Sequence, residues 1–122
     1  MTKILYVDDE ADIREIAQLA LELDPDIEVR SCASGTEGLE AAAAWHPDLI
    51  LLDVMMPGMD GPTTFARLRD QAATATIPVV FITARTQSHE VQRFHELGAR
   101  GVLAKPFDPM TLAEQVRALL DG

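Results

Sequence analysis

Acidic, hydroxyl and basic side chains directly follow four short apolar runs of this sequence. The residues are Asp8, Asp9 and Glu10 after 3–7, Asp53 after 49–52, Thr83 after 79–82, and Lys105 after 101–104. Carboxylates gathered in a partly buried site repel one another, so at least one takes up a proton unless a cation compensates. Mg²⁺ prefers oxygen ligands and is usually held by one or two carboxylates. An aspartate beside such a cation, a lysine and a hydroxyl group is suited to capture a phosphoryl group covalently.

Each of these side chains has its own expected role. We expect Asp9 and Asp53 to be carboxylate ligands of Mg²⁺ or Mn²⁺, with Asp8 holding a coordinated water. In phosphoryl capture, Asp53 attacks phosphorus while Lys105 and Thr83 bind the phosphoryl oxygens. Purely structural roles are the alternative. Asp8 or Asp9 could cap the following helix, Thr83 could be an ordinary strand residue, and Asp53 could simply end a strand.

The apolar runs that precede these residues predict the elements that position them. Five short runs predict strands, at 3–7, 27–31, 49–52, 79–82 and 101–104. Helical periodicity separates them: Ile13, Ile16, Ala17, Ala20 and Leu23 share one face, as do Leu112, Val116, Leu119 and Leu120. Alternation of strand and helix predicts the α/β class, a doubly wound parallel sheet with helices on both faces.

Local signals also predict where helices begin and end. Ser34 followed by Glu37 has the form of a capping box, and the Gly61-Pro62 and Asp108-Pro109 pairs place proline in a first turn. We interpret Asp60 mainly as a turn or helix-cap residue. Gly98 is typical of a helix C-terminus.

Length and composition limit the function classes. A chain of 122 residues predicts one domain, and a net charge of -10 argues against nucleic acid and anionic membranes as partners. One cysteine, Cys32, excludes an internal disulfide and favours a reducing compartment. The sequence has no signal peptide and no apolar run long enough for a membrane span, so we expect a cytoplasmic protein.

Taken together, four motifs resemble the receiver domain of bacterial two-component response regulators. They are "ILYVDDE" (4–10), "LLDVMMPGMDG" (51–61), "VVFITA" (79–84) and "AKPF" (104–107), and the similarity covers essentially the whole chain. The resemblance implies a five-stranded sheet of order 2-1-3-4-5. It implies Asp53 as phosphoacceptor, Asp8 and Asp9 as the acidic pair, Thr83 as switch hydroxyl and Lys105 as phosphate-binding lysine. It also implies that the backbone carbonyl of Met55 completes the metal site and that the Lys105-Pro106 bond is cis.

The resemblance further implies a signalling switch rather than a metabolic enzyme. The phosphoryl donor would be a histidine kinase or a histidine phosphotransfer protein. With the chain ending at Gly122, we expect a stand-alone receiver domain (1–122) that acts on a downstream protein or dimerises through the face of the fourth helix, fifth strand and fifth helix. One departure is Val102, where receivers often carry an aromatic switch residue.

Two rival functions remain at this stage. A receiver-like module could act without phosphorylation, but its expected sign, loss of an acidic, phosphoacceptor or lysine position, is absent. A Mg²⁺-dependent phosphohydrolase with an aspartyl phosphate would usually need a general acid two residues after the nucleophile, and that position is Met55.

Overall fold

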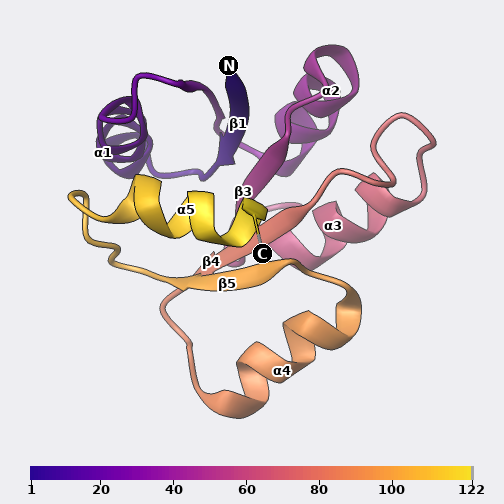
Figure 1. Cartoon of the computed structure of the whole chain (residues 1–122). Coiled ribbons are helices and arrows are strands. Elements are labelled where there is room, and N and C mark those ends of the chain that lie inside the picture. Colours follow the sequence, from indigo (N-terminus) through magenta and orange to yellow (C-terminus); the bar gives the residue numbers. More distant parts are fainter. Residues whose placement is uncertain (122) are drawn as a thin grey trace.

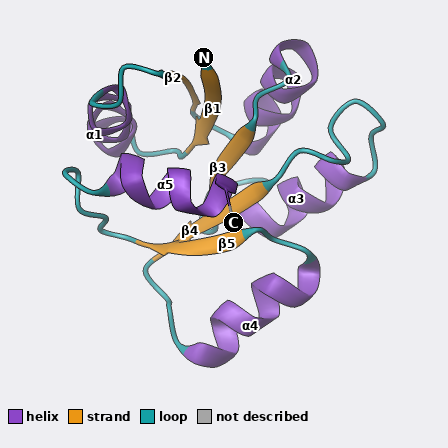
Figure 2. Ribbon diagram, viewed as in Figure 1, coloured by secondary structure: helices purple, strands orange, loops and turns teal. Residues whose placement is uncertain are grey.

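The computed structural model describes residues 1–121, which form one parallel sheet flanked by helices (Figures 1 and 2). The strands are β1 (Thr2–Val7), β2 (Ile27–Cys32), β3 (Leu49–Asp53), β4 (Val79–Thr83) and β5 (Gly101–Ala104). The helices are α1 (Ala11–Glu22), α2 (Gly35–Trp45), α3 (Gly61–Arg69), α4 (Ser88–Leu97) and α5 (Leu112–Asp121). The strand order is β2-β1-β3-β4-β5, so the expected class and order are confirmed.

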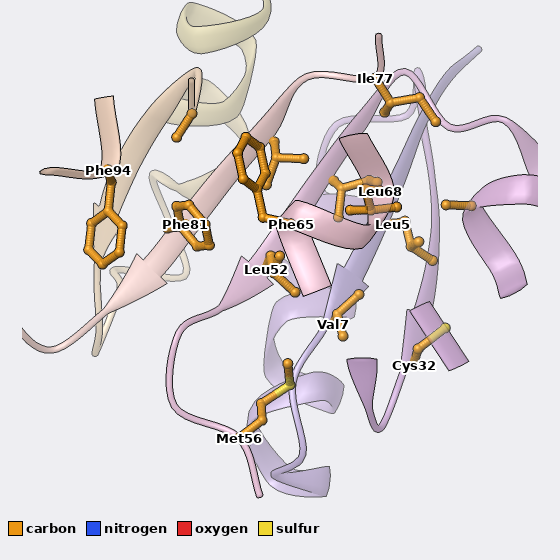
Figure 3. Packing of buried hydrophobic residues seen from close by; sticks show 14 residues of the cluster. Leu5, Val7, Cys32, Leu52, Met56, Phe65, Leu68, Ile77, Phe81 and Phe94 are labelled. Carbon is orange, nitrogen blue, oxygen red and sulfur yellow. The ribbon is translucent and has the colours of Figure 1, made fainter. Parts of the chain in front are cut away.

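The sheet separates two apolar clusters, one on each face. One cluster joins Leu5, Leu52 and Phe81 of the sheet to Phe65 of α3 and Phe94 of α4 (Figure 3). The other joins the opposite sides of the same strands to α1 and α5, through Ala17, Leu21, Leu112 and Val116 among others. All residues of β3 and β4 are buried, which explains why their sequences are almost uniformly apolar.

Most helix boundaries follow the local sequence signals. Glu37 donates its backbone N–H to Ser34 Oγ at 3.2 Å, and Thr63 donates its backbone N–H to Asp60 Oδ1 at 2.9 Å, so both predicted caps are confirmed. Gly98 ends α4 with φ of 106°, a left-handed conformation that glycine adopts readily. The prediction for Pro109 was wrong. It precedes α5, which begins at Leu112 after a turn at residues 109–111.

The predicted buried face of α1 was only partly right. Ala17, Ala20 and Leu21 are buried, whereas Ile16 and Leu23 are 42% and 61% exposed. The periodicity locates an apolar stripe, but the docking of the helix decides which edge of that stripe meets the sheet. In α1 the small alanines face inward and Ile16 lies toward solvent, while Leu23 directly follows the last residue of the helix.

No helix within residues 1–121 has both the length and the apolar character that crossing a membrane requires.

Candidate functional site

The expected site residues meet at the carboxyl edge of the sheet. Asp53 is the last residue of β3 and Thr83 the last of β4, while Asp8 and Lys105 directly follow β1 and β5. In the register of the parallel strands Asp53 lies opposite Ile82, and Thr83 lies opposite Ala104. Because all these strands run in one direction, their ends deliver the side chains to one place.

Three carboxylates form the centre of this cluster. Asp8, Asp9 and Asp53 each provide an oxygen atom, and these atoms all lie within 4.8 Å of one another. Asp8 is 0% exposed and Asp53 is 3% exposed, whereas Asp9 is exposed to solvent. Two of the three negative charges are therefore largely removed from water, which is costly unless a positive charge lies close by.

Lys105 provides that positive charge from the end of β5. Its Nζ lies 3.0 Å from Asp8 Oδ2, 3.0 Å from Glu10 Oε1 and 3.4 Å from Asp53 Oδ2. The Lys105-Pro106 peptide bond is cis, as expected. One ammonium group thus faces several carboxylates, and its longest contact is with Asp53.

The pKa values of Asp53 and Lys105 reflect this excess of carboxylates over ammonium groups. Burial, followed by the charge of Asp8, raises the pKa of Asp53 to about 6, although Lys105 and the Met55 backbone hydrogen bond oppose the rise. Burial acts to lower the pKa of Lys105, but hydrogen bonds to Glu10 and Asp8 and the charge of Asp53 outweigh it and raise that pKa above its ordinary value. Lys105 is therefore a cation at neutral pH, and the ionised Asp53 is held at a cost in free energy.

The loop after Asp53 approaches the strand end very closely. The backbone N–H of Gly61 donates to the carbonyl of Val54 at 2.9 Å, and a Cβ at position 61 would lie 2.4 Å from the Asp53 carbonyl oxygen. Only glycine fits there without moving the backbone that carries Asp53. The side chain of Met55 projects into solvent and is 70% exposed.

Thr83 and Met55 line the open side of the site. A pocket of about 410 Å³ is lined by Glu10, Ile13, Asp53, Met55, Thr83, Ala84, Lys105 and Pro106. Thr83 is 3% exposed, and its Oγ1 accepts a hydrogen bond from the backbone N–H of Arg85 at 3.0 Å. The structure thus gathers Asp8, Asp9, Asp53, Thr83, Lys105 and Met55 at one pocket, while the roles given to them remain predictions.

Three further residues contact this site, and the sequence reasoning gave them no role. Glu10 pairs with Lys105, Arg14 Nη1 donates to the Asp8 carbonyl at 2.8 Å, and the Tyr6 hydroxyl donates to Asp8 Oδ2 at 3.0 Å. Burial, followed by the charge of Asp8, raises the pKa of Tyr6 above its ordinary value, so the hydroxyl keeps its proton. Strand alternation could have indicated Tyr6, because side chains two residues apart point to the same face.

The donor set fits a hard divalent cation. All three clustered ligand atoms are carboxylate oxygens, the ligand type of Mg²⁺ and Mn²⁺, and soft sulfur or imidazole ligands are not part of the cluster. Lys105 alone leaves the pocket with excess negative charge once Asp53 ionises. A divalent cation held by Asp9 and Asp53, with Asp8 next to it, would neutralise most of that excess.

The fold and the acidic pocket define a class of signalling domain, and comparison with known proteins agrees. The family model of the response regulator receiver domain matches residues 4–117. The chain is 44% identical over 119 residues to the transcriptional regulatory protein CseB of Streptomyces avermitilis, covering 98% of this chain and 49% of CseB. It is also 44% identical over 119 residues to the response regulator PleD of Caulobacter vibrioides, covering 96% of this chain and 26% of PleD.

Solved structures show the same fold over nearly the whole chain. The chemotaxis protein CheY4 of Vibrio cholerae superposes with a TM-score of 0.88 at 34% identity, covering 98% of both chains. A response regulator structure from Chloroflexus aurantiacus gives a TM-score of 0.87 at 36% identity, covering 99% of this chain and 98% of the other. This chain belongs to the response regulator receiver domain family of two-component systems. It spans about half the length of CseB.

Proposed function

We propose that the protein is a phosphorylation-activated switch that accepts a phosphoryl group on Asp53 from a phosphohistidine donor. The observation that carries the proposal is the position of Asp53, which is 3% exposed at a rigid strand end with Lys105 Nζ at 3.4 Å and two other aspartates beside it. A carboxylate buried at such a cost suggests chemistry rather than a structural cap.

The phosphoryl transfer needs no reactant besides Asp53 and the phosphohistidine of the donor. A carboxylate oxygen of Asp53 forms a bond to phosphorus while the bond between phosphorus and the histidine nitrogen of the donor breaks, and that nitrogen keeps the electron pair. Lys105 binds a phosphoryl oxygen, and Thr83 binds another once its hydroxyl turns toward the pocket. Water later attacks phosphorus, which releases inorganic phosphate and regenerates the Asp53 carboxylate.

Asp9 and Asp53 would hold Mg²⁺ or Mn²⁺, with Asp8 acting through a coordinated water and the Met55 carbonyl as a further ligand. When bound, the cation supplies positive charge for the phosphoryl oxygens. The ionised form of Asp53 is the nucleophile, and a neighbouring cation favours that form.

The proposed partners follow from this chemistry. The donor is a histidine kinase or a histidine phosphotransfer protein, and the output is a contact with another protein or self-association through the face of α4, β5 and α5. Some relatives carry DNA-binding names, such as the response regulator MtrA of Mycolicibacterium paratuberculosis. Three expectations for this chain therefore stay predictions. They are that it has no nucleic-acid partner, that residues 1–122 form a single domain, and that it is cytoplasmic.

Neither rival function accounts for the whole pocket. A phosphorylation-independent module has no need of a buried aspartate beside Lys105. A phosphohydrolase would share the carboxylates and Lys105, but it usually needs an acid at position 55, and the Met55 side chain offers none and extends into solvent.

Intact-protein mass spectrometry with phosphoramidate and Mg²⁺ tests the proposal. We expect a phosphoryl adduct on the wild type, no adduct on Asp53→Asn, and no adduct on the wild type with the metal chelated. Glu40→Gln, which changes an exposed carboxylate on α2, is the matched control and should behave as the wild type. An adduct that persists on Asp53→Asn would overturn the assignment of the site, and a wild type that stays unmodified both with phosphoramidate and with a phosphorylated histidine kinase would overturn the function.

A further inference from the structure

Tyr6 places a hydroxyl group beneath the acidic pocket. Its side chain is 0% exposed, and the hydroxyl donates to Asp8 Oδ2 at 3.0 Å. The ring packs in the apolar cluster that includes Ala17 of α1 and Leu112 of α5, which fixes where the hydroxyl points. Phenylalanine would fill the same apolar space, so only the contact with Asp8 explains the polar atom.

The hydrogen bonds of Asp8 show why this hydroxyl matters. Asp8 Oδ1 accepts from the backbone N–H of Glu10 at 3.0 Å, and Asp8 Oδ2 accepts from both the Tyr6 hydroxyl and Lys105 Nζ, each at 3.0 Å. Asp8 is 0% exposed, so bulk water does not replace a partner that leaves. A buried carboxylate oxygen without a donor is strongly disfavoured.

Phosphorylation at Asp53 would draw Lys105 away from Asp8. A phosphoryl group carries more negative charge than a carboxylate and offers three strong acceptor oxygens. Once Lys105 turns toward it, the protein donor that stays on Asp8 Oδ2 is the Tyr6 hydroxyl. The backbone hydrogen bond from Glu10 reaches only the other oxygen and cannot fix the second one.

We propose that Tyr6 is a positioning residue, whose hydroxyl holds the Asp8 carboxylate in its metal-facing orientation when Lys105 changes partners. This inference rests on the proposed function for its purpose, but the positioning itself can be measured in the unphosphorylated protein. Tyr6 acts through Asp8 and touches neither the metal nor the phosphoryl group.

The first test measures the side-chain orientation of Asp8 in metal-free, isotope-labelled protein, through the NMR scalar couplings that report its χ1 angle. The proposal expects one rotamer in the wild type, one rotamer in Lys105→Met where Tyr6 is still present, and averaging between rotamers in the double variant Tyr6→Phe/Lys105→Met. A single rotamer in the folded double variant, or averaging already in Lys105→Met, would overturn the proposal. If the double variant does not fold, the Mg²⁺ titration of Tyr6→Phe described next decides, and an affinity equal to that of the wild type would overturn the proposal.

The second test measures Mg²⁺ affinity by titrating backbone amide signals. We expect Tyr6→Phe to weaken Mg²⁺ binding about tenfold, as changes to groups that orient metal ligands commonly do. Thr74→Val is the matched control. Thr74 is 0% exposed, and its hydroxyl donates to the Leu68 carbonyl at 2.6 Å, so this variant loses a buried hydroxyl contact in the loop between α3 and β4. Its Mg²⁺ affinity should not change.

A double-mutant cycle shows whether Tyr6 works through Asp8. In an Asp8→Asn background, Tyr6→Phe should cause no further loss of Mg²⁺ affinity. An equal tenfold loss in both backgrounds, or an equal loss in Thr74→Val, would refute positioning and leave a general effect on stability. Failure of the proposed function would give a different result from failure of the Tyr6 proposal. The wild type would form no phosphoryl adduct, while the Asp8 couplings would still depend on Tyr6.

Discussion

In the metal-free protein, replacing Asp53 with asparagine should stabilise the fold at neutral pH. The pKa of Asp53 lies at about 6, against an ordinary value of 3.8, because burial and the charge of Asp8 disfavour ionisation. A carboxyl group with a raised pKa binds its proton more tightly in the folded state, so ionisation costs stability. The cost appears as the pH rises from about 4 to 6 and is complete above pH 6.

The size of the effect follows from the same pKa values. A rise from 3.8 to about 6 corresponds to about 3 kcal/mol, at roughly 1.4 kcal/mol for each pKa unit. Water entering the pocket screens part of this, so we expect Asp53→Asn to gain about 1–2 kcal/mol in free energy of unfolding at pH 7.5. For a domain of this size that is a rise in melting temperature of about 3–8 °C.

Urea denaturation in the presence of a chelator, repeated from pH 4 to pH 8, measures this difference. The gain should be absent near pH 4, where Asp53 is protonated in the wild type, and should grow as the pH rises to about 6.5. Mg²⁺ should then narrow the gap, because it binds the wild type more tightly than the variant. Glu40→Gln, an exposed carboxylate replaced by an amide, should change stability by less than about 0.5 kcal/mol. If Asp53→Asn were less stable than the wild type at pH 7.5, or its gain did not depend on pH, the electrostatic account of the pocket would be wrong.

Three further changes test the other parts of the site. Lys105→Met should lower the free energy of unfolding of the metal-free protein by about 2 kcal/mol, because the buried carboxylates lose their cation. It should also slow phosphorylation by phosphoramidate at least about tenfold. A variant as stable and as reactive as the wild type would contradict this. Gly61→Ala should lower the free energy of unfolding, measured by urea denaturation, by about 3 kcal/mol, since its Cβ would meet the Asp53 carbonyl oxygen. Gly58→Ala, with a φ of 76° and nothing within 4 Å of its Cβ, should lower it by only about 1 kcal/mol. Equal losses would refute the steric argument. Thr83→Val should still form the phosphoryl adduct at Asp53 by mass spectrometry, but the amide signals of α4 should respond less to phosphorylation than in the wild type, and an unchanged response would remove Thr83 from the switch.

The sequence alone was sufficient for the α/β class and for most of the residues that gather at the pocket. Strands such as 49–52 and 79–82 are uniformly apolar because both faces of the sheet are covered, and that pattern is visible without coordinates. The chemistry-bearing residues follow these runs directly, and parallel strands bring their ends together. The strand order, however, came from the resemblance to receiver domains, because alternation of strand and helix does not specify it.

The tertiary structure decided the contacts within the pocket and the docking of the helices. Only the fold shows that Lys105 meets Glu10 as well as Asp8, and that α1 buries Ala17 rather than Ile16. The physical reason is that a sequence pattern records which side chains avoid water. Which polar groups pair with each other, and how far each helix is rotated about its axis, depend on distances set by the packing of all the elements. The hydroxyl of Tyr6 is the clearest case. In the sequence it is one more apolar residue of a strand, and in the fold it is the partner of a buried carboxylate.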